Sequence, residues 1–288
     1  MKRLACTFAA FALVLFAFGC NQETPKQQAQ QPAPQEINVK LELSKMSTLE
    51  KVLKRGELRV GFESGYVPFE MTNKKGNFIG FDIDMAKEMA KAMGVKFVPV
   101  NTAWDGIIPA LLSDKFDIIM SGMTVTQERN LKIGFADPYI VVGQTILLNP
   151  KLEGTITSYK DLNDPKYTVT SKLGTTGEQA VKRYIPKCNY KSFENETEAV
   201  LEVINGKADA YVYDLPNCVY FKAEYGDKVI FLDKPFTFEP LAWAINKGDP
   251  DFMNWLNNFL RQVKNDGRYE RMYNKWILHQ EWIKELSE

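Results

Sequence analysis

Apolar and polar positions follow two different rhythms along most of the chain. Over residues 80–94 the apolar residues recur at helical spacing and Gly94 ends the pattern, which predicts a helix. Short apolar runs such as 57–62 and 116–120 have the length and composition of buried strands. The alternation of strands and helices resumes over 167–213. This order predicts an α/β fold built on wound, largely parallel sheets.

The helix expected over residues 47–56 carries signals at both of its ends. Ser47 and Glu50 have the spacing of a capping box, in which each side chain satisfies a free backbone N–H group. Gly56 is expected to close the helix in a left-handed conformation. We therefore expect the first helix of the folded region to lie here.

Two distant segments resemble each other and indicate two lobes. ALLSDKFDIIMSG ends at Gly122, and LEVINGKADAYVYD ends at Asp214; each reads as a helix, a turn through lysine and a strand containing aspartate. In this register Ser121 and Gly122 align with Tyr213 and Asp214. Because ligands of open α/β sheets bind beyond the carboxyl ends of the strands, both positions are candidates for a site between two lobes.

The stretch SGMTVTQER at residues 121–129 places small hydroxyl residues and one arginine after a strand. Small residues let a ligand approach the backbone, and arginine holds carboxylates through paired hydrogen bonds. Taken alone, the stretch also fits a solvated Arg129 in the first turn of a helix. Arg129 and Asp214 facing each other across a cleft would complement a zwitterion.

The amino terminus has the pattern of an export signal. Two basic residues precede the apolar run 4–19, which is marginally short for a membrane span and ends before Cys20. We expect residues 1–19 to be a signal peptide and Cys20 to carry the lipid of a bacterial lipoprotein; the alternative is an ordinary secreted protein cut nearby. Residues 20–40 are rich in Gln and Pro and are expected to form a disordered tether.

Composition excludes several classes of function. Lys plus Arg equal Asp plus Glu at 36 each, so no overall positive charge favours nucleic acid. A single histidine, His279, argues against histidine-based triads and multi-histidine metal sites. Beyond the signal and tether only Cys188 and Cys218 remain, and both are expected to be free thiols. We expect no metal, no cofactor and no later membrane span.

Seven motifs, in order and at matching spacing, carry a resemblance to a known family. They are GYVPFE, GFDIDM, WDGIIPAL, SGMTVTQER, LGTTGE, KADAYVYDLP and NDGRYERMYNKW. Together they resemble the bacterial extracellular solute-binding proteins of family 3, which serve amino-acid ABC transporters. The resemblance implies a two-lobed periplasmic-binding-protein fold of type II, with a wound, mostly parallel sheet in each lobe and two crossing hinge strands.

The same resemblance implies the lobe boundaries. Lobe 1 is expected to comprise residues 41–139 and 242–288, and lobe 2 residues 144–236. The hinges are expected at 139–143 and 237–241.

The family's ligand residues can be transferred to matching positions. Arg129 resembles the arginine that holds the α-carboxylate. Its implied helpers are Ser121, Thr124 and nearby backbone amides, including that of Gly122. Thr176 resembles a second carboxylate donor, and Asp214 resembles the acid that receives the α-ammonium group.

The side chain of the ligand is expected to meet a different group of residues. Tyr66 and Trp104 resemble aromatic walls, although such residues also serve as ordinary core. Glu63 matches a position that touches the ligand side chain, which favours arginine or lysine. Lys172 stands where some relatives contact the ligand. If Lys172 pairs with Glu63, the pocket is neutral and a glutamine-like side chain fits better.

The expected function is capture of a polar, basic amino acid for an ABC permease. The protein is expected to be a monomer that acts in the periplasm or at the cell surface, held to the membrane by its lipid. One alternative is a dehydratase-like enzyme acting on a small carboxylate; this chemistry needs a general acid, and a zwitterion would occupy both Glu63 and Asp214. Another alternative is a sensor that takes no part in transport.

Overall fold

The computed structural model describes residues 47–279 and 282–283. The expected signal peptide, the tether and Cys20 lie outside this part of the chain, as do the first residues expected in lobe 1. The described region contains two separate five-stranded sheets.

The first sheet has four strands that run in one direction and one antiparallel strand, β14, between two of them. Its order is β4–β1–β5–β14–β6, with β1 parallel to both β4 and β5, and β14 antiparallel to β5 and β6. The strands are β1 (Glu57–Phe62), β4 (Lys96–Asn101), β5 (Ile118–Ile119), β6 (Gly134–Phe135) and β14 (Ala244–Ile245). A strand from the carboxyl-terminal part therefore completes a sheet begun near the amino terminus.

The second sheet repeats this topology position by position. Its order is β10–β9–β11–β8–β12, with parallel pairing around β9 and antiparallel pairing around β8. The strands are β8 (Gln144–Leu148), β9 (Thr168–Lys172), β10 (Asn189–Phe193), β11 (Ala210–Asp214) and β12 (Ile230–Leu232). The predicted α/β class with two wound sheets is confirmed, and each sheet is mixed because its fourth strand, β14 or β8, runs antiparallel to both neighbours.

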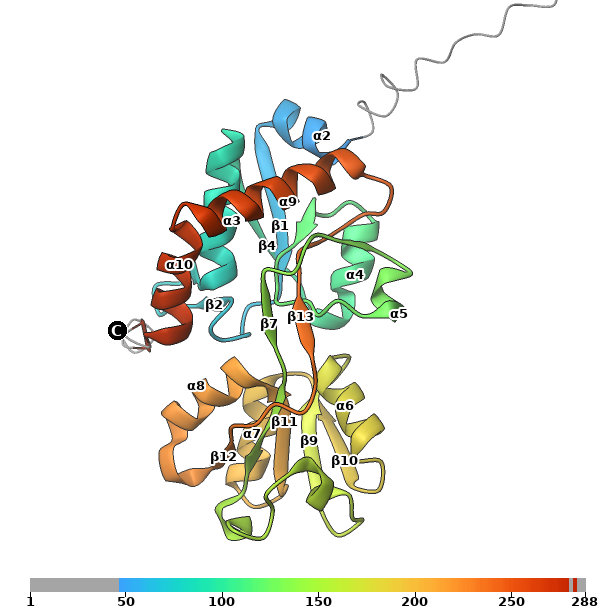
Figure 1. Ribbon diagram of the computed structural model, residues 1–288, viewed down its shortest axis with the longest axis vertical. Coiled ribbons are helices and arrows are strands. Elements are labelled where there is room, and N and C mark those ends of the chain that lie inside the picture. The colour runs from blue at the N-terminus through green and yellow to red at the C-terminus, as the bar shows by residue number, and fades with distance from the viewer. Residues whose placement is uncertain (1–46, 280–281, 284–288) are drawn as a thin grey trace, which may run out of the picture. The chain divides into compact units, whose positions relative to one another are not determined.

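Helices flank both sheets (Figure 1). Those of the first lobe are α2 (Thr48–Arg55), α3 (Phe81–Met93), α4 (Trp104–Leu112), α5 (Gln127–Asn130), α9 (Pro250–Asn265), α10 (Arg268–Tyr273) and the π-helical turn η4 (Asn274–Leu278). Those of the second lobe are α6 (Thr176–Tyr184), α7 (Glu196–Ile204), α8 (Leu215–Tyr225) and the short 3-10 turns η1 (Pro150–Leu152), η2 (Tyr159–Leu162) and η3 (Gly226–Lys228). A small hairpin of β2 (Met71–Thr72) and β3 (Phe78–Ile79) precedes α3.

Two strands run between the sheets. β7 (Ile140–Val142) and β13 (Glu239–Leu241) pair in antiparallel register, with Val141 opposite Pro240. Figure 1 shows them side by side between the two lobes. Because β7 leads into β8 and β13 leads toward β14, these strands carry the chain into the second lobe and back.

The periodic apolar residues of α3 form part of the main core. Ile83, Met85, Ala86 and Met89 are all buried there, as the helical spacing predicts. Removing a large buried side chain of this kind costs about 2–5 kcal/mol of stability. The core thus fixes α3 against the sheet and, with it, the loop that precedes the helix.

The capping box predicted for α2 is wrong. The Ser47 side chain makes no bond to the helix end; its hydroxyl donates to Asp251 at 2.8 Å, and the Thr48 N–H donates to Asp249 at 2.6 Å. A carboxylate from the start of α9 has replaced the local acceptor. Gly56 does close the helix, with φ of 73°.

Cys188 and Cys218 are free thiols. Cys218 is buried, and burial raises the pKa of its thiol to about 12. Among the helices in the described ranges, none combines the length and apolar character needed to cross a bilayer.

Candidate functional site

A narrow cavity lies where the two lobes meet, and about 20 Å³ of it is open to a water-sized sphere. Every residue expected to contact the ligand lines it, except Lys172. The lining residues are Glu63, Tyr66, Trp104, Ser121, Gly122, Thr124, Arg129, Thr175, Thr176, Glu196, Tyr213 and Asp214. Most follow the carboxyl ends of the parallel strands in the two sheets, where open α/β sheets bind ligands.

Arg129 is a buried cation that no direct ion pair balances among the described residues, although the charge of Glu239 acts on it. Its Nη1 donates to the Thr124 carbonyl oxygen at 3.0 Å, and its guanidinium lies 5.2 Å from the centre of the Trp104 ring. Only 7% of the residue is exposed, and burial lowers the pKa of the guanidinium. No carboxylate in the part of the chain described forms an ion pair with it. A buried arginine held by carbonyl and aromatic groups is suited to bind an anion such as a carboxylate.

Local structure fixes the direction of Arg129. The residue lies in the short helix α5, whose N-cap Thr126 accepts the Arg129 backbone N–H at 3.1 Å. The helix begins immediately after the loop of small residues that follows β5. The hypothesis of a solvated arginine is therefore wrong, because the side chain turns into the protein.

Asp214 is the matching buried acid in the second lobe. The Tyr66 hydroxyl donates to its Oδ2, and the Gln144 Nε2 donates to its Oδ1 at 2.5 Å. Burial raises the pKa of Asp214 to about 7, although both donors oppose the shift. Within the described ranges it has no ion-pair partner, so an ammonium group in the cavity would supply its missing cation.

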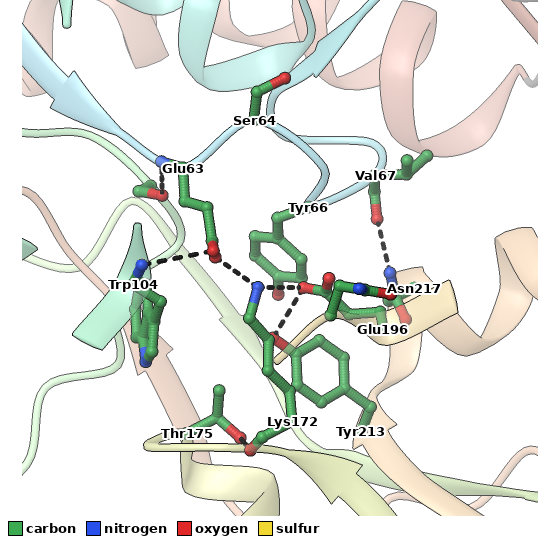
Figure 2. A network of polar contacts seen from close by, with 12 residues as sticks. Glu63, Ser64, Tyr66, Val67, Trp104, Lys172, Thr175, Glu196, Tyr213 and Asn217 are labelled. Atoms are coloured by element: carbon green, nitrogen blue, oxygen red, sulfur yellow. Dashed lines mark hydrogen bonds and ion pairs between the residues drawn. The ribbon is translucent and has the colours of Figure 1, made fainter. Parts of the chain in front are cut away.

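Lys172 joins acids from both lobes (Figure 2). Its Nζ pairs with Glu63 of the first lobe and with Glu196 of the second, the latter at 3.0 Å. The Trp104 backbone N–H also donates to Glu63 at 3.3 Å, and the Tyr213 hydroxyl donates to Glu196 at 3.2 Å. The pairing of Lys172 with Glu63, left open by the sequence, is therefore present, and a second acid joins it.

The two acids decide the protonation state of this cluster. Burial alone would lower the pKa of Lys172, but the charges of Glu196 and Glu63 outweigh burial and raise it. Burial raises the pKa of Glu63, and Lys172 opposes that shift. Lys172 is thus a fixed cation shared between two carboxylates.

Direct contacts close the lobes over the cavity. The Trp104 Nε1 donates to the Gly174 carbonyl oxygen at 3.0 Å, and the same oxygen accepts from the Arg129 Nη2 at 3.4 Å. The hydroxyls of Thr124 and Thr176 lie 3.4 Å apart. The residues expected to hold the ligand carboxylate from opposite lobes therefore lie within reach of one another.

Gly122 is required by its close contact with Tyr66. Its φ is +53°, and a Cβ placed on it would lie 2.2 Å from the Tyr66 Cε1 atom. Any other residue would displace the ring whose hydroxyl holds Asp214. The small residue in this loop thus serves the packing of Tyr66 as well as ligand access.

Sequence reasoning missed three lining residues: Thr175, Glu196 and Tyr213. Tyr213 could have been found, because the internal repeat aligns it with Ser121. Glu196 is the first residue of α7 and follows β10, so the rule about strand ends also applied to it. Across the described ranges, no cluster of acids, cysteines and histidine could hold a metal ion.

Solved structures share both the fold and much of the sequence. A putative binding component of an ABC transporter from Wolinella succinogenes, complexed with lysine, is 55% identical, with 80% of this chain and 99% of that chain covered and a TM-score of 0.78. An ancestral amino-acid-binding protein, a precursor of cyclohexadienyl dehydratase, is 51% identical to this chain. The alignment covers 80% of this chain and 100% of the ancestral protein, with a TM-score of 0.77. The two-lobed periplasmic-binding-protein fold of type II is thereby confirmed.

A relative and a family model extend this similarity. The ABC transporter glutamine-binding protein of Bacillus subtilis is 32% identical over 241 residues, with 81% of this chain and 86% of the relative covered. The model of bacterial extracellular solute-binding proteins, family 3, matches residues 58–279. This match includes both sheets and the whole cavity lining, and the chain therefore belongs to family 3 of the bacterial extracellular solute-binding proteins.

Proposed function

We propose that the protein binds an L-amino acid with a cationic side chain, lysine or arginine, and delivers it to an ABC permease. The observation that carries this proposal is the charge around the cavity. Among the lining residues and Lys172 beside them, Glu63, Glu196 and Asp214 supply three negative charges against two positive charges from Lys172 and Arg129. This set has one negative charge left over, and the buried Glu239, whose charge acts on Arg129 and Asp214 from outside the lining, adds to the surplus. A zwitterion with a cationic side chain opposes this negative surplus.

Glu196 is the residue that favours a basic ligand over glutamine. The pair of Lys172 and Glu63 alone would leave the side-chain region neutral and suit an uncharged amide. Glu196 lies 3.0 Å from the same ammonium group and is itself buried, so the region keeps an excess carboxylate. The lysine in the Wolinella succinogenes complex supports the same choice, whereas the glutamine-binding relative supports the alternative.

We propose binding rather than catalysis. A dehydratase needs an acid aimed at a leaving group. Here Glu63 is held by Lys172 and Trp104, while Asp214 is held by Tyr66 and Gln144. The similarity to an ancestral amino-acid-binding protein also supports a binder. Release of a keto acid or aromatic product on incubation with small carboxylates would contradict this proposal.

The proposed setting is outside the cytoplasmic membrane. We propose that the chain is a lipoprotein anchored through Cys20, acts as a monomer and moves between open and closed states about β7 and β13. Cys20→Ala should shift the protein from the membrane fraction to the soluble fraction without changing the affinity of the folded domain. Unchanged fractionation would rule out Cys20 as the anchor.

A thermal-shift screen of the purified protein against the common amino acids tests the proposal. A ligand that binds only the native state raises stability by RT ln(1 + [L]/Kd), about 4 kcal/mol at a thousand times Kd. Lysine or arginine should give the largest shift, and mass spectrometry of co-purified ligand should find the same compound. Stabilisation by glutamine with no response to lysine or arginine would contradict the proposal.

A further inference from the structure

Two carboxyl groups lie buried directly behind the loop expected to bind the ligand's carboxylate. Glu70 and Asp82 are both 0% exposed. The hydroxyl of Ser121 lies 2.5 Å from the Glu70 Oε1. The Asp82 Oδ2 accepts from the Gly122 N–H at 2.9 Å and from the Tyr139 hydroxyl at 2.9 Å. Each acid therefore supports one of two neighbouring residues that line the cavity.

Within the described part of the chain, these two acids have no cation to neutralise them. Among the described residues neither forms an ion pair, and the second oxygen of each, Glu70 Oε2 and Asp82 Oδ1, has no hydrogen-bond partner. Two ionised carboxylates buried this way would be costly, so buried carboxyl pairs retain a proton. Glu70 is the more favourable site for this proton. Two hydrogen bonds donated to the Asp82 Oδ2 stabilise the ionised form of Asp82.

The pKa directions agree with this assignment. Burial, followed by the charge of Asp82, raises the pKa of Glu70 well above its ordinary value. Burial raises the pKa of Asp82 to about 7, against the hydrogen bonds from Gly122 and Tyr139. Asp82 thus ionises first as the pH rises.

The position of this proton decides what Ser121 can offer a ligand. A hydroxyl has one proton and two lone pairs, and the Ser121 oxygen already accepts the Glu63 backbone N–H at 3.1 Å. If Glu70 is ionised, the Ser121 proton must point to Glu70, and only a lone pair is left for the cavity. If Glu70 is protonated, it donates to Ser121, whose own proton is then free for a ligand carboxylate.

We propose that Glu70 is a positioning residue that holds a proton and thereby makes Ser121 a hydrogen-bond donor to the ligand's carboxylate. This inference rests on the proposed function only in requiring a ligand carboxylate beside Arg129. It applies equally to a basic amino acid and to glutamine. Asp82 supports the arrangement, because its negative charge discourages the ionisation of Glu70.

The proposal predicts a loss of affinity at alkaline pH. The titratable groups that act on Glu70 are Asp82, Glu63, Glu196 and Tyr139, and the negative charge of the three acids favours its protonated form. Binding requires protonated Glu70, so affinity is full below the pKa of Glu70 in the free protein. Affinity falls as the pH rises through that value, by up to about tenfold per pH unit.

Calorimetric titration with L-lysine from pH 6 to pH 10 can isolate this effect. Glu70→Gln keeps a donor toward Ser121 at every pH. The affinity of this variant should therefore not show the fall that ionisation of Glu70 causes in the wild type. The ligand's own ammonium groups titrate identically with both proteins, and the ratio of wild-type Kd to Glu70→Gln Kd cancels them. The ratio should be constant at low pH and then rise at alkaline pH, by up to about tenfold per unit.

Asp82→Asn provides a control in the opposite direction. It removes the charge that raises the pKa of Glu70 and keeps an oxygen acceptor for Gly122 and Tyr139. Its alkaline loss of affinity should therefore begin at lower pH than in the wild type. Circular dichroism confirms that each variant is folded before its affinity is compared.

A Kd ratio that stays flat to pH 10 with folded Glu70→Gln would overturn the proposal. If that variant does not fold, carbon-13 NMR of the wild-type protein labelled at glutamate carboxyl groups decides. One glutamate should keep its protonated shift above pH 7, and its absence would equally overturn the proposal. If L-lysine and L-arginine fail to bind, the proposed ligand class is wrong, and the same pH comparison is made with L-glutamine.

Discussion

The two lobes have the same sheet topology but differ in how they hold the buried acids Glu196, Glu70 and Asp82. In the second lobe the buried Glu196 is paired with Lys172 from the end of the neighbouring strand β9. In the first lobe Glu70 and Asp82 are buried with no ion-pair partner among the described residues, and hydroxyl and amide donors are their only support. Glu70 in the first lobe therefore holds a proton, whereas Glu196 in the second lobe is ionised and paired with Lys172.

This difference matches the two ends of the proposed ligand. The first lobe faces the α-carboxylate with Arg129 and Ser121, and a neutral carboxyl group behind Ser121 avoids repelling it. The second lobe faces cationic groups with Asp214 and Glu196, where fixed negative charge is useful. Apart from Glu63, which reaches Lys172 from the first lobe, the two copies of one topology thus present opposite charges at their strand ends.

Removing the principal charge of either lobe should give the largest effect. Arg129→Ala or Asp214→Ala leaves a charged group of the ligand desolvated without its partner, at a cost of about 2–5 kcal/mol of affinity. Folding should survive, because both side chains face the cavity. Calorimetry with L-lysine measures the loss, and unchanged affinity for Arg129→Ala would disprove the carboxylate clamp.

Neutralising the acids around Lys172 tests whether they recognise the ligand side chain. Glu63→Gln and Glu196→Gln should each weaken lysine binding by about 1.5–3 kcal/mol, the scale of a hydrogen bond to a charged group. Binding of glutamine should change little. Glu202→Gln, on the same helix α7 but away from the cavity, is the matched control. Equal losses for lysine and glutamine would show that the acids only hold Lys172.

Gly122→Ala should lower the unfolding free energy more than Gly56→Ala, because only Gly122 has a side chain close to its Cα atom. Both Gly122 and Gly56 have positive φ, but a Cβ meets nothing within 4 Å at Gly56 and meets the Tyr66 ring at 2.2 Å at Gly122. The extra contact should cost about 1–3 kcal/mol of unfolding free energy beyond Gly56→Ala. Urea denaturation of both variants measures the difference, and equal stability would mean that Tyr66 can move freely.

Protonation of Asp214, in the second lobe, should weaken ligand binding as the pH falls. The pKa of Asp214 is raised to about 7 by burial, and an ammonium ligand prefers the ionised form. Affinity is therefore full above that value and falls below it, by up to about 1.4 kcal/mol per pH unit. Titration in buffers of different ionisation enthalpy should detect proton release near pH 7. Binding without proton release would contradict this role.

Local sequence was enough for the elements, and the resemblance to the family supplied most of the cavity lining. Helix α3 and strands β1 and β9 follow from spacing and length, because periodicity reports burial directly. The family motifs led to Arg129 and Asp214. The capping box at Ser47 failed because its partner, Asp251, comes from a helix that is 204 residues away.

The remaining features depend on contacts that no local pattern encodes. Glu70 meets Ser121 across 51 residues, and Lys172 meets Glu63 across 109. Glu196 was not among the expected site residues, and the fold places it 3.0 Å from Lys172. Only the packing of one strand end against another decides whether such a charge is solvated or buried.

Calorimetric titration of the wild-type protein with L-lysine, L-arginine and L-glutamine at pH 7.5 tests the central claim most directly. The excess carboxylate near the side chain should make lysine or arginine bind more tightly than glutamine by about 1.5–3 kcal/mol, roughly tenfold to a hundredfold or more in Kd. Tight binding of glutamine, with no measurable heat from lysine or arginine, would contradict the assignment of a cationic ligand.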